Sequence, residues 1–390
     1  MSINLNFCPH CGSKLPNKGE VFCPECGKKL ALEQFEQSLQ APQSTQVQEV
    51  ASSPGPSSQQ VLPSADLGAQ ARQGFNSIVE HVNQMTGGTG KVELKLKDLV
   101  ISVGNKHTAE EAEEIFSCGT AKTTPPETEI SSAWPRPWLY SRVFLVLAVT
   151  FVGLLFMARH FHNVNAIPGI IFIGAMVVPF SAVIFFFEVN APRNISIFEV
   201  TKIFFIGGVA SLLTTCTLYE IADIKTWTIS SAMMIGVVEE LGKIMVVAYY
   251  LNSTRKKYIL NGLLIGAAVG AGFAVFETAG YIMRSNDITS IIYLRGILAL
   301  GGHVAWTGLA GAALAMVKNE RPLDSEVILH PKFLQFLVVV IVMHGMWDMP
   351  VEISSTLPVM QIFLTAAVWL FLLVMINAGL RQISEIEHAR

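Results

Sequence analysis

The chain has 390 residues, of which 51% are hydrophobic and only 15% are charged, and its mean hydropathy is +0.46. A soluble domain carries about a quarter charged residues, so this composition excludes an ordinary soluble protein. The formal net charge of −3 and the lack of a basic tract give no reason to expect a nucleic-acid partner.

Two Cys-x-x-Cys pairs stand at the N-terminus in the repeated pattern CPxCG, formed by Cys8, Cys11, Cys23 and Cys26. Two such turns bring four thiolates to one closed tetrahedral zinc site, which is structural because no coordination position stays open. The alternative, two disulfides, needs an oxidising compartment. The pattern resembles the zinc ribbons at the front of many bacterial membrane proteins. It predicts a Cys₄ zinc ribbon over residues 1–30, compatible with docking of a cytosolic protein partner.

Polar sequence continues up to residue 133 and is predicted to form a flexible linker with a short cytosolic helical segment, residues 31–133. Gln, Ser and Pro dominate residues 32–63, as in a disordered tether. An amphipathic helix is predicted over 65–85, and 91–103 fits either a strand pair or a short helix. Thr108 followed by Glu111 is a capping-box pattern, which predicts a helix that ends near Phe116.

About eight apolar runs follow, each long enough to cross a bilayer by the rule of roughly 20 residues. They are 138–157, 167–187, 198–218, 228–251, 259–283, 291–317, 333–350 and 357–380. The predicted fold class is therefore an all-α polytopic membrane protein of about eight transmembrane helices over residues 134–390, preceded by the small zinc ribbon.

Basic residues in the loops predict how this bundle is oriented. They follow the fourth and sixth runs as Arg255, Lys256, Lys257, Lys318, Arg321 and Lys332, whereas the third and seventh loops carry mainly carboxylates. The even-numbered loops and both termini are therefore expected on the cytosolic side, which is also where a reduced zinc ribbon is stable.

Ionisable residues interrupt four consecutive runs: Glu239, Glu240 and Lys243, then Glu277, then His303, then His344 and Asp348. Each charge at mid-bilayer costs about 2.5–3.5 kcal/mol, so a set of this size indicates a function. The alternative is a set of structural ion pairs. It accounts for Glu239 with Lys243, one helical turn apart, but not for the excess of carboxylates over cations.

Helical periodicity predicts that these groups converge. Gly262, Gly266 and Gly270 repeat every four residues, which is typical of a close-packed helix face. Glu277 continues that face and is expected to point into the bundle. Similar stripes join His303, Thr307 and Gly311 on the sixth run, and His344 with Asp348 on the seventh. All of these groups are expected between mid-membrane and the outer leaflet.

Carboxylates beside neutral histidines can activate water and stabilise an oxyanion, and the same residue types can bind a divalent metal through nitrogen and oxygen. The other signatures of intramembrane peptidases, His-Glu-x-x-His, Gly-x-Gly-Asp and Gly-x-Ser-x-Gly, do not occur in the sequence.

Taken together, these motifs resemble the PrsW family of intramembrane proteases. The resemblance rests on Glu-Glu-x-x-Lys (Glu239, Glu240, Lys243), Phe-x-x-x-Glu (Phe273, Glu277) and His-x-x-x-Asp (His344, Asp348). A fourth motif of the family falls at Arg295, His303, Thr307 and Gly311. One motif alone is weak, but four in order on four successive runs, within residues 138–380, are specific.

This family is similar to the CAAX prenyl endopeptidases, and the resemblance implies a role for each residue. Glu239 would be the general base, with Glu240 in support, while His344 and Asp348 would stabilise the tetrahedral intermediate. The second motif ends in histidine in those relatives and in Glu277 here. Either His303 fills that gap or Glu277 is a ligand of a divalent metal.

The resemblance further implies a membrane-anchored protein substrate, a role in regulated proteolysis and a bacterial cytoplasmic membrane as the location. Two alternatives remain: a non-proteolytic member of the superfamily, and an ion-coupled transporter that uses the buried carboxylates. Transporters commonly contain internal repeats, and the sequence shows none. A signalling scaffold that acts through the ribbon is a third hypothesis. Cleavage of a membrane-anchored reporter would separate the peptidase from these.

Overall fold

The computed structural model describes residues 67–388, apart from positions 223, 225–227, 255, 286–287 and 351–357. Residues Ala65–Arg390 belong to one compact unit. The cysteines of the predicted zinc ribbon and the predicted tether over 32–63 lie outside the described residues.

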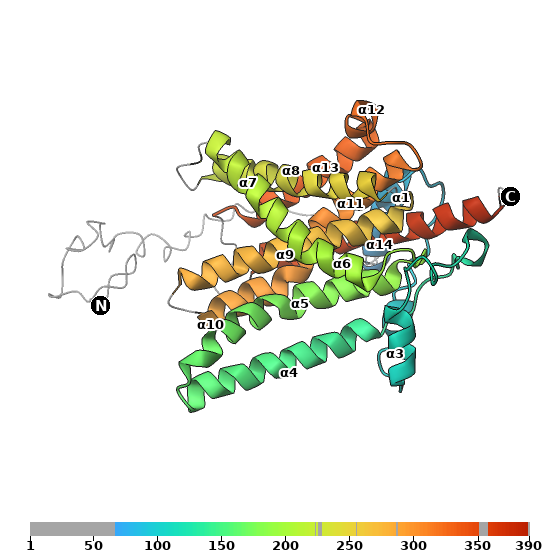
Figure 1. Ribbon diagram of the computed structural model, residues 1–390. Coiled ribbons are helices and arrows are strands. Elements are labelled where there is room, and N and C mark those ends of the chain that lie inside the picture. Colours follow the sequence, from blue (N-terminus) through green and yellow to red (C-terminus); the bar gives the residue numbers. More distant parts are fainter. Residues whose placement is uncertain are drawn as a thin grey trace, which may run out of the picture. The chain divides into compact units, whose positions relative to one another are not determined.

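Helices form all the regular secondary structure in these described ranges, and the long ones run side by side as a bundle (Figure 1). From residue 139 onward the α-helices, long and short, are α4 (Leu139–His160), α5 (Ile167–Val189), α6 (Ile197–Lys202), α7 (Gly208–Ala222), α8 (Ile229–Ser253), α9 (Ile259–Met283), α10 (Ile288–Ile291), α11 (His303–Lys318), α12 (Ser325–Ile328), α13 (Pro331–Trp347) and α14 (Val359–His388). The prediction of an all-α polytopic membrane protein is confirmed at this level.

Six helical segments are long and apolar enough to cross a membrane: Leu139–His160, Val164–Val189, Ile197–Ala222, Ile259–Met283, Leu298–Lys318 and Val359–His388. The predicted fourth and seventh runs correspond to α8, which has 25 residues but carries three charged side chains, and to α13, which has 17 residues. The structure therefore supports six spans, and the count of eight stays a prediction.

Helix α9 lies at the centre of the bundle, where 94% of its most apolar window is buried (Figure 1). Its glycine face packs directly on the backbone of α11, as the four-residue repeat predicts. A β-carbon added at Gly262, Gly266 or Gly270 would collide with the carbonyl oxygens of Gly311, Thr307 and His303, respectively. Only glycine allows this close approach, which fixes the axial register of the two helices.

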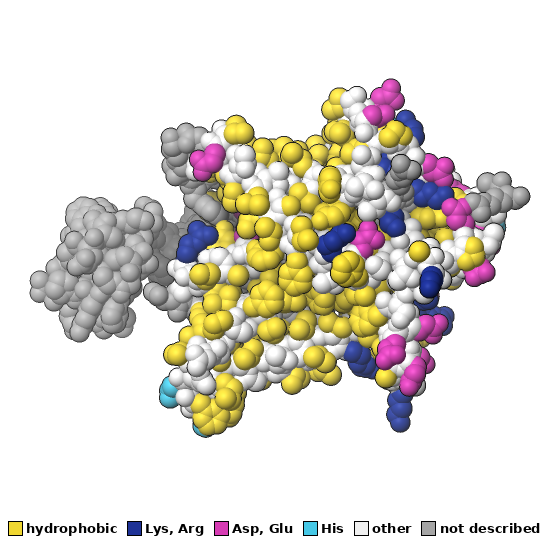
Figure 2. All heavy atoms as spheres, viewed as in Figure 1, with side chains coloured by type: hydrophobic (Ala, Val, Ile, Leu, Met, Phe, Trp, Pro, Cys, Tyr) yellow, Lys and Arg dark blue, Asp and Glu magenta, His cyan; other side chains and the backbone are white. Residues whose placement is uncertain are grey.

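Helix α4, in contrast, lies at the rim of the bundle beside α5 (Figure 1), and none of its most apolar window is buried. It exposes a run of large apolar side chains: Phe144, Leu145, Val146, Val149, Val152 and Phe156. Figure 2 shows a continuous apolar band on this face of the bundle, with charged side chains gathered mainly toward its right-hand end. A lipid bilayer is the environment that such a band requires.

The segment before the bundle packs against one end of it. Helix α1 (Leu67–Met85) places Val79 and Val82 on Val374 of α14. Arg381 of α14 donates a hydrogen bond to the Thr86 carbonyl oxygen at 3.0 Å. The first short helices are therefore held on the bundle.

Two further helices in this segment match their sequence patterns. Residues 91–103 contain the short helix α2 (Asp98–Ile101), which decides between the strand pair and the helix. The next helix, α3 (Ala109–Phe116), begins with the predicted capping box of Thr108 and Glu111. Beside it, His107 stacks on Trp138 with ring centroids 3.7 Å apart.

Candidate active site

One connected network contains seven of the ionisable residues that interrupt the apolar runs: Glu239, Glu240, Lys243, Glu277, His303, His344 and Asp348. Four helices supply them, because α8, α9, α11 and α13 pack around one point. Two of these residues lie at helix ends: His303 is the first residue of α11, and His344 lies in the last turn of α13. The network therefore lies nearer the end of the bundle that contains the α7–α8 and α9–α10 connections.

His344 is fully buried and surrounded by carboxylates. Its Nδ1 lies 2.8 Å from Glu240 Oε1, while its Nε2 lies 3.5 Å from Glu239 Oε2 and 3.3 Å from Asp348 Oδ2. The Trp306 ring stacks on the imidazole with centroids 4.5 Å apart, which fixes its plane. If Nδ1 donates to Glu240, a neutral His344 turns its lone pair toward two carboxylates. That arrangement needs a proton or a metal cation at Nε2.

His303 has a defined tautomer. Its Nδ1 lies 2.8 Å from the Lys243 ammonium, which can only donate, so Nδ1 accepts this hydrogen bond. The proton must then be on Nε2, which donates to Glu277 Oε2 at 2.9 Å. Arg295 also donates to this Glu277 oxygen. Glu277 and Arg295 together therefore hold the His303 ring in place.

Lys243 links the two halves of the network and has no exposed side-chain surface. Its Nζ lies 2.8 Å from Glu240 Oε1 and 3.4 Å from Glu239 Oε2, and 4.3 Å from the centroid of the Phe273 ring. The predicted pair with Glu239 is thus present, but the closer partner of the ammonium is Glu240.

A divalent metal fits this donor set. Glu239, His303 and His344 each offer one ligand atom, and these atoms all lie within 4.8 Å of one another. Both histidines bind a carboxylate with the other ring nitrogen, Glu240 for His344 and Glu277 for His303. This carboxylate–histidine arrangement orients histidines that ligate metals. Glu277 lies outside the donor set and positions His303 instead.

The charges of the network also fit a divalent cation. Its four carboxylates are Glu239, Glu240, Glu277 and Asp348, and the permanent cations paired with them are Lys243 and Arg295. Two negative charges are left over when both histidines are neutral. Buried charges require compensation, and one divalent ion would supply it.

A cavity of about 530 Å³ leads to the network and reaches Glu239, Glu277 and Asp348. Its walls are mostly apolar, and they include Leu212 of α7, Ile235 of α8 and Phe273 of α9. Ile224 and Arg284 line it at the end of the bundle nearest the network. The cavity therefore places apolar side chains next to the Glu239, Glu277 and Asp348 carboxylates.

Two residues of the site carry no clear signal in the sequence. Tyr219 of α7 donates from its hydroxyl to Glu239 Oε1 at 2.8 Å. Trp306 stacks on His344, and its indole nitrogen is buried without a hydrogen-bond partner. A tyrosine at the end of an apolar run and a tryptophan within one are both common in membrane helices, so neither stands out before the helices are packed.

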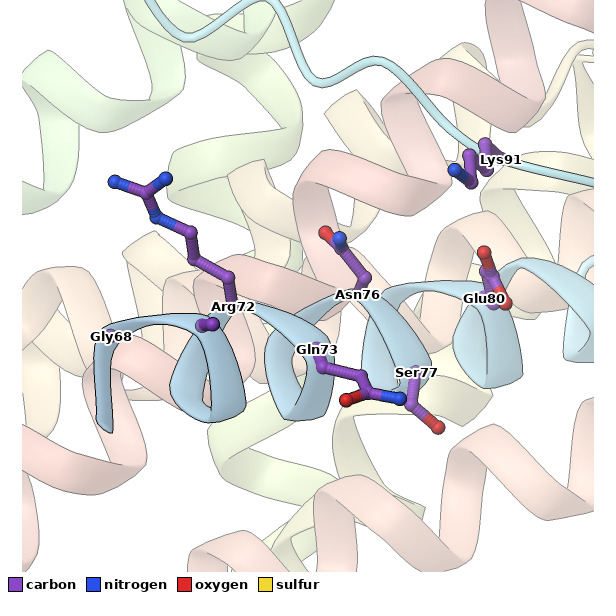
Figure 3. Close-up of a pocket in the computed structure, with 8 residues that line it drawn as sticks. Gly68, Arg72, Gln73, Asn76, Ser77, Glu80 and Lys91 are labelled. Atoms are coloured by element: carbon purple, nitrogen blue, oxygen red, sulfur yellow. The ribbon is translucent and has the colours of Figure 1, made fainter. Parts of the chain in front are cut away.

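A second hollow, of about 680 Å³, lies along α1 and is not a candidate active site (Figure 3). Its lining is exposed and polar, and its charged residues are Arg72, Glu80 and Lys91. Figure 3 shows Arg72 and Glu80 on separate turns of the helix and Lys91 on the segment that follows it, so the three side chains are not directed at one point. They do not form the kind of convergent set that binds a metal or activates water.

Residues 195–376 match the model of a family described as PrsW family intramembrane metalloprotease. The matched region contains every residue of the network, including Tyr219 and Arg295, and it agrees with the resemblance seen in the motifs. No curated protein and no solved structure matches the chain.

Proposed function

We propose that this chain is a PrsW-family endopeptidase of the membrane, which hydrolyses a peptide bond in a membrane-anchored protein substrate. The observation that supports this most directly is the buried set of Glu239, His303 and His344, of which Glu239 lines a cavity. It lies within the region that matches a family of intramembrane metalloproteases.

Glu239 is the residue that takes the proton from the attacking water. Its carboxylate faces the cavity, and Tyr219 holds Oε1, so that Oε2 stays directed toward the two histidines. Glu240 supports it by holding His344 and Lys243. When no metal occupies the site, His344 protonated at Nε2 and oriented by Glu240 and Asp348 donates to the oxygen of the tetrahedral intermediate.

A divalent metal would be held by Glu239, His303 and His344, and when bound there it would supply Lewis-acid polarisation of the scissile carbonyl. The other residues act on these three side chains. Glu277 and Arg295 keep the His303 ring in place, and apolar side chains of the cavity wall lie beside the carboxylates. Both the base role and the ligand role require the Glu239 carboxylate.

We also propose that both termini are cytosolic and that the site lies in the outer half of the membrane. The basic loops that follow α8 and α11 lie at the end of the bundle that α3 and the last turn of α14 occupy (Figure 1), and there Lys318 donates a hydrogen bond to the Lys256 carbonyl oxygen at 3.2 Å. There Lys257 forms ion pairs with Glu127 at 2.6 Å and with Glu320 at 2.7 Å. The network lies nearer the opposite end. A bacterial cytoplasmic membrane and regulated proteolysis are the setting that the family suggests.

The decisive experiment measures cleavage of a membrane-anchored reporter by the purified protein in liposomes, followed by mass spectrometry of the products. Glu239→Gln should abolish cleavage. The matched control is Glu220→Gln, because Glu220 is exposed near the same end of α7 as Tyr219 but has no described contact with the network. Full cleavage by a folded Glu239→Gln protein would reject the proposal and favour the ion-coupled transporter.

A further inference from the structure

The Lys243 ammonium donates a hydrogen bond to His303 Nδ1, the nitrogen that a metal ion would need as a ligand. His303 has its single proton on Nε2, where Glu277 accepts it, so Nδ1 offers one lone pair. In the structure that lone pair accepts a hydrogen bond from Lys243 at 2.8 Å. A lone pair cannot serve an ammonium proton and a metal ion at the same time.

The ammonium also shares a second donor with the metal. Lys243 Nζ lies 3.4 Å from Glu239 Oε2, an oxygen that is itself 3.9 Å from His303 Nδ1 and 3.5 Å from His344 Nε2. A divalent ion bound to these atoms would lie within a few ångströms of the ammonium, where two cations repel each other strongly in a buried site. The lysine and the metal therefore compete for both space and charge.

Lys243 has a partner to which it can retreat. Glu240 Oε1 lies 2.8 Å from the ammonium and does not belong to the proposed metal ligands. The aromatic face of Phe273 offers a further favourable surface for the cation, 4.3 Å from the ammonium. A lysine side chain has four rotatable bonds, so a small rotation could release His303 while keeping the contact with Glu240.

We propose that Lys243 is an internal cation that competes with a metal ion for His303 and Glu239, and that it withdraws onto Glu240 when the metal binds. Lys243 is then a positioning residue that stabilises the metal-free site and sets its metal affinity. The inference rests on the metal-binding part of the proposed function, but its test does not depend on cleavage.

The test measures zinc affinity of the purified full-length protein in detergent by competition with a chromophoric chelator. All proteins carry Cys8→Ser, Cys11→Ser, Cys23→Ser and Cys26→Ser, so that the predicted ribbon does not contribute. Lys243→Met removes the competing ammonium and retains an unbranched side chain. Arg295→Met is the matched control, since it removes a positive charge from the same network without freeing a donor atom of the metal set.

Lys243→Met should tighten zinc binding by about 10-fold to 100-fold, the range over which groups around the ligands change metal affinity. Arg295→Met should not tighten binding by more than about threefold, because loss of a charge alone is partly offset by a looser His303. Equal effects of the two variants, or no zinc binding by any of the proteins, would overturn the proposal.

A measurement without substitutions at Lys243 decides the question if Lys243→Met does not fold. Nitrogen-15 NMR of labelled His and Lys side chains follows the protein as zinc is added. Signals of both His303 Nδ1 and Lys243 Nζ should shift together and saturate at one equivalent. A shift of His303 with an unchanged Lys243, or no shift of either signal, would contradict the competition. Loss of cleavage in Glu239→Gln tests the peptidase separately, so failure of one proposal is distinguishable from failure of the other.

Discussion

At the scale of single residues, the two adjacent glutamates of α8 have different tasks. Glu240 binds the Lys243 ammonium and His344 Nδ1, both at 2.8 Å, and is almost fully buried. Glu239 lies farther from the same two partners, 3.4 Å from Lys243 and 3.5 Å from His344, and it faces the cavity. Glu240 therefore holds the network together, whereas Glu239 is available for chemistry.

This difference predicts opposite results for two equivalent substitutions. Glu239→Gln should remove cleavage and leave the melting temperature close to that of the wild type, because Lys243 keeps Glu240 and His303 as partners. Glu240→Gln should lower the free energy of unfolding by about 3–5 kcal/mol, since it leaves a buried cation without its closest partner. Thermal melts of both variants beside the cleavage assay provide the comparison. The assignment is wrong if Glu239→Gln is the less stable protein.

Tyr219 gives a second prediction at this scale. Tyr219→Phe removes the hydrogen bond to Glu239 Oε1 and nothing else from the network. A hydrogen bond to a charged group contributes about 1.5–3 kcal/mol, so if this bond orients the carboxylate for catalysis, the cleavage rate should fall by about tenfold or more. Single-turnover rates at saturating reporter would show it. An unchanged rate would mean that Tyr219 does not orient the carboxylate.

The residues that sequence could identify are those whose presence in an apolar run is itself costly. Glu239, Glu277, His303 and His344 stand out for that reason, and the structure joins them. Tyr219 does not stand out, because a tyrosine at a helix end has no energetic cost to explain. The preference of Lys243 for Glu240 depends on rotamers, since both glutamates lie within one helical turn of it.

At the scale of helices, the contact of α9 with α11 positions half of the site. It brings the backbone of Gly270 against that of His303, so the His303 ring is placed by helix packing as well as by its hydrogen bonds. Hydropathy alone predicts one continuous run over 291–317, but the structure begins α11 at His303. The turns before it are π-helical at Ile292–Ile297 and 3₁₀-helical at Leu298–Gly301. Hydropathy does not distinguish such turns from an α-helix, because they leave the apolar content of the span unchanged.

A methyl group at this contact should therefore disturb both stability and function. Gly266→Ala would place a β-carbon against the Thr307 carbonyl oxygen, where neither backbone can yield. Overpacking of this kind costs about 1–3 kcal/mol, and the shift of α11 should also reduce cleavage. Gly153→Ala on α4 is the control, because no atom lies within 4 Å of its added β-carbon. Equal melting temperatures for the two variants would refute the close-packed interface.

At the scale of the whole molecule, charge and apolar surface are segregated along the bundle. Figure 2 shows Lys, Arg, Asp and Glu side chains gathered mainly toward one end of the face in view, beyond the apolar band. The basic loops after the fourth and sixth runs predict that Lys and Arg gather at one end of the bundle, because this depends only on which residues join the helices. The packing of α1 and α3 on the bundle end was not predictable in the same way. It depends on contacts between residues far apart in the chain, such as Val82 with Val374 and His107 with Trp138.

The proposed topology can be measured with a membrane-impermeant thiol reagent applied to intact spheroplasts. Met283→Cys, at the exposed end of α9 near the site, should be labelled from outside. Glu320→Cys, exposed beside Lys257, should be labelled only after the membrane is permeabilised. Labelling of the parent protein, which has native cysteines, is the baseline. The reverse pattern would invert the orientation and place the N-terminal cysteines outside the cytosol.

Metal content tests the predicted ribbon at the same scale. Full-length protein purified under reducing conditions should contain one zinc more per chain than the variant with serine at Cys8, Cys11, Cys23 and Cys26, because those thiolates are expected to share one ion. The variant should keep its cleavage activity, since the ribbon carries no part of the proposed mechanism. Elemental analysis of both proteins gives the result. Equal zinc contents would remove the ribbon from the description of this chain.

The glycine face of α9 also has a mechanical consequence. Two helices in backbone-to-backbone contact cannot slide or separate by a change of side-chain rotamers. Helices α9 and α11 therefore form a rigid pair, with Glu277 and His303 at one end. The opposite wall of the cavity belongs to α7, which turns large apolar side chains such as Leu213 and Ile221 outward. A lipid-facing helix has fluid neighbours and can tilt at little elastic cost. The first turn of α7 is itself held on α9, where Gly208 meets the backbone of Gly272. We therefore expect the cavity to widen by displacement of the last turns of α7, with the distances around His303 unchanged.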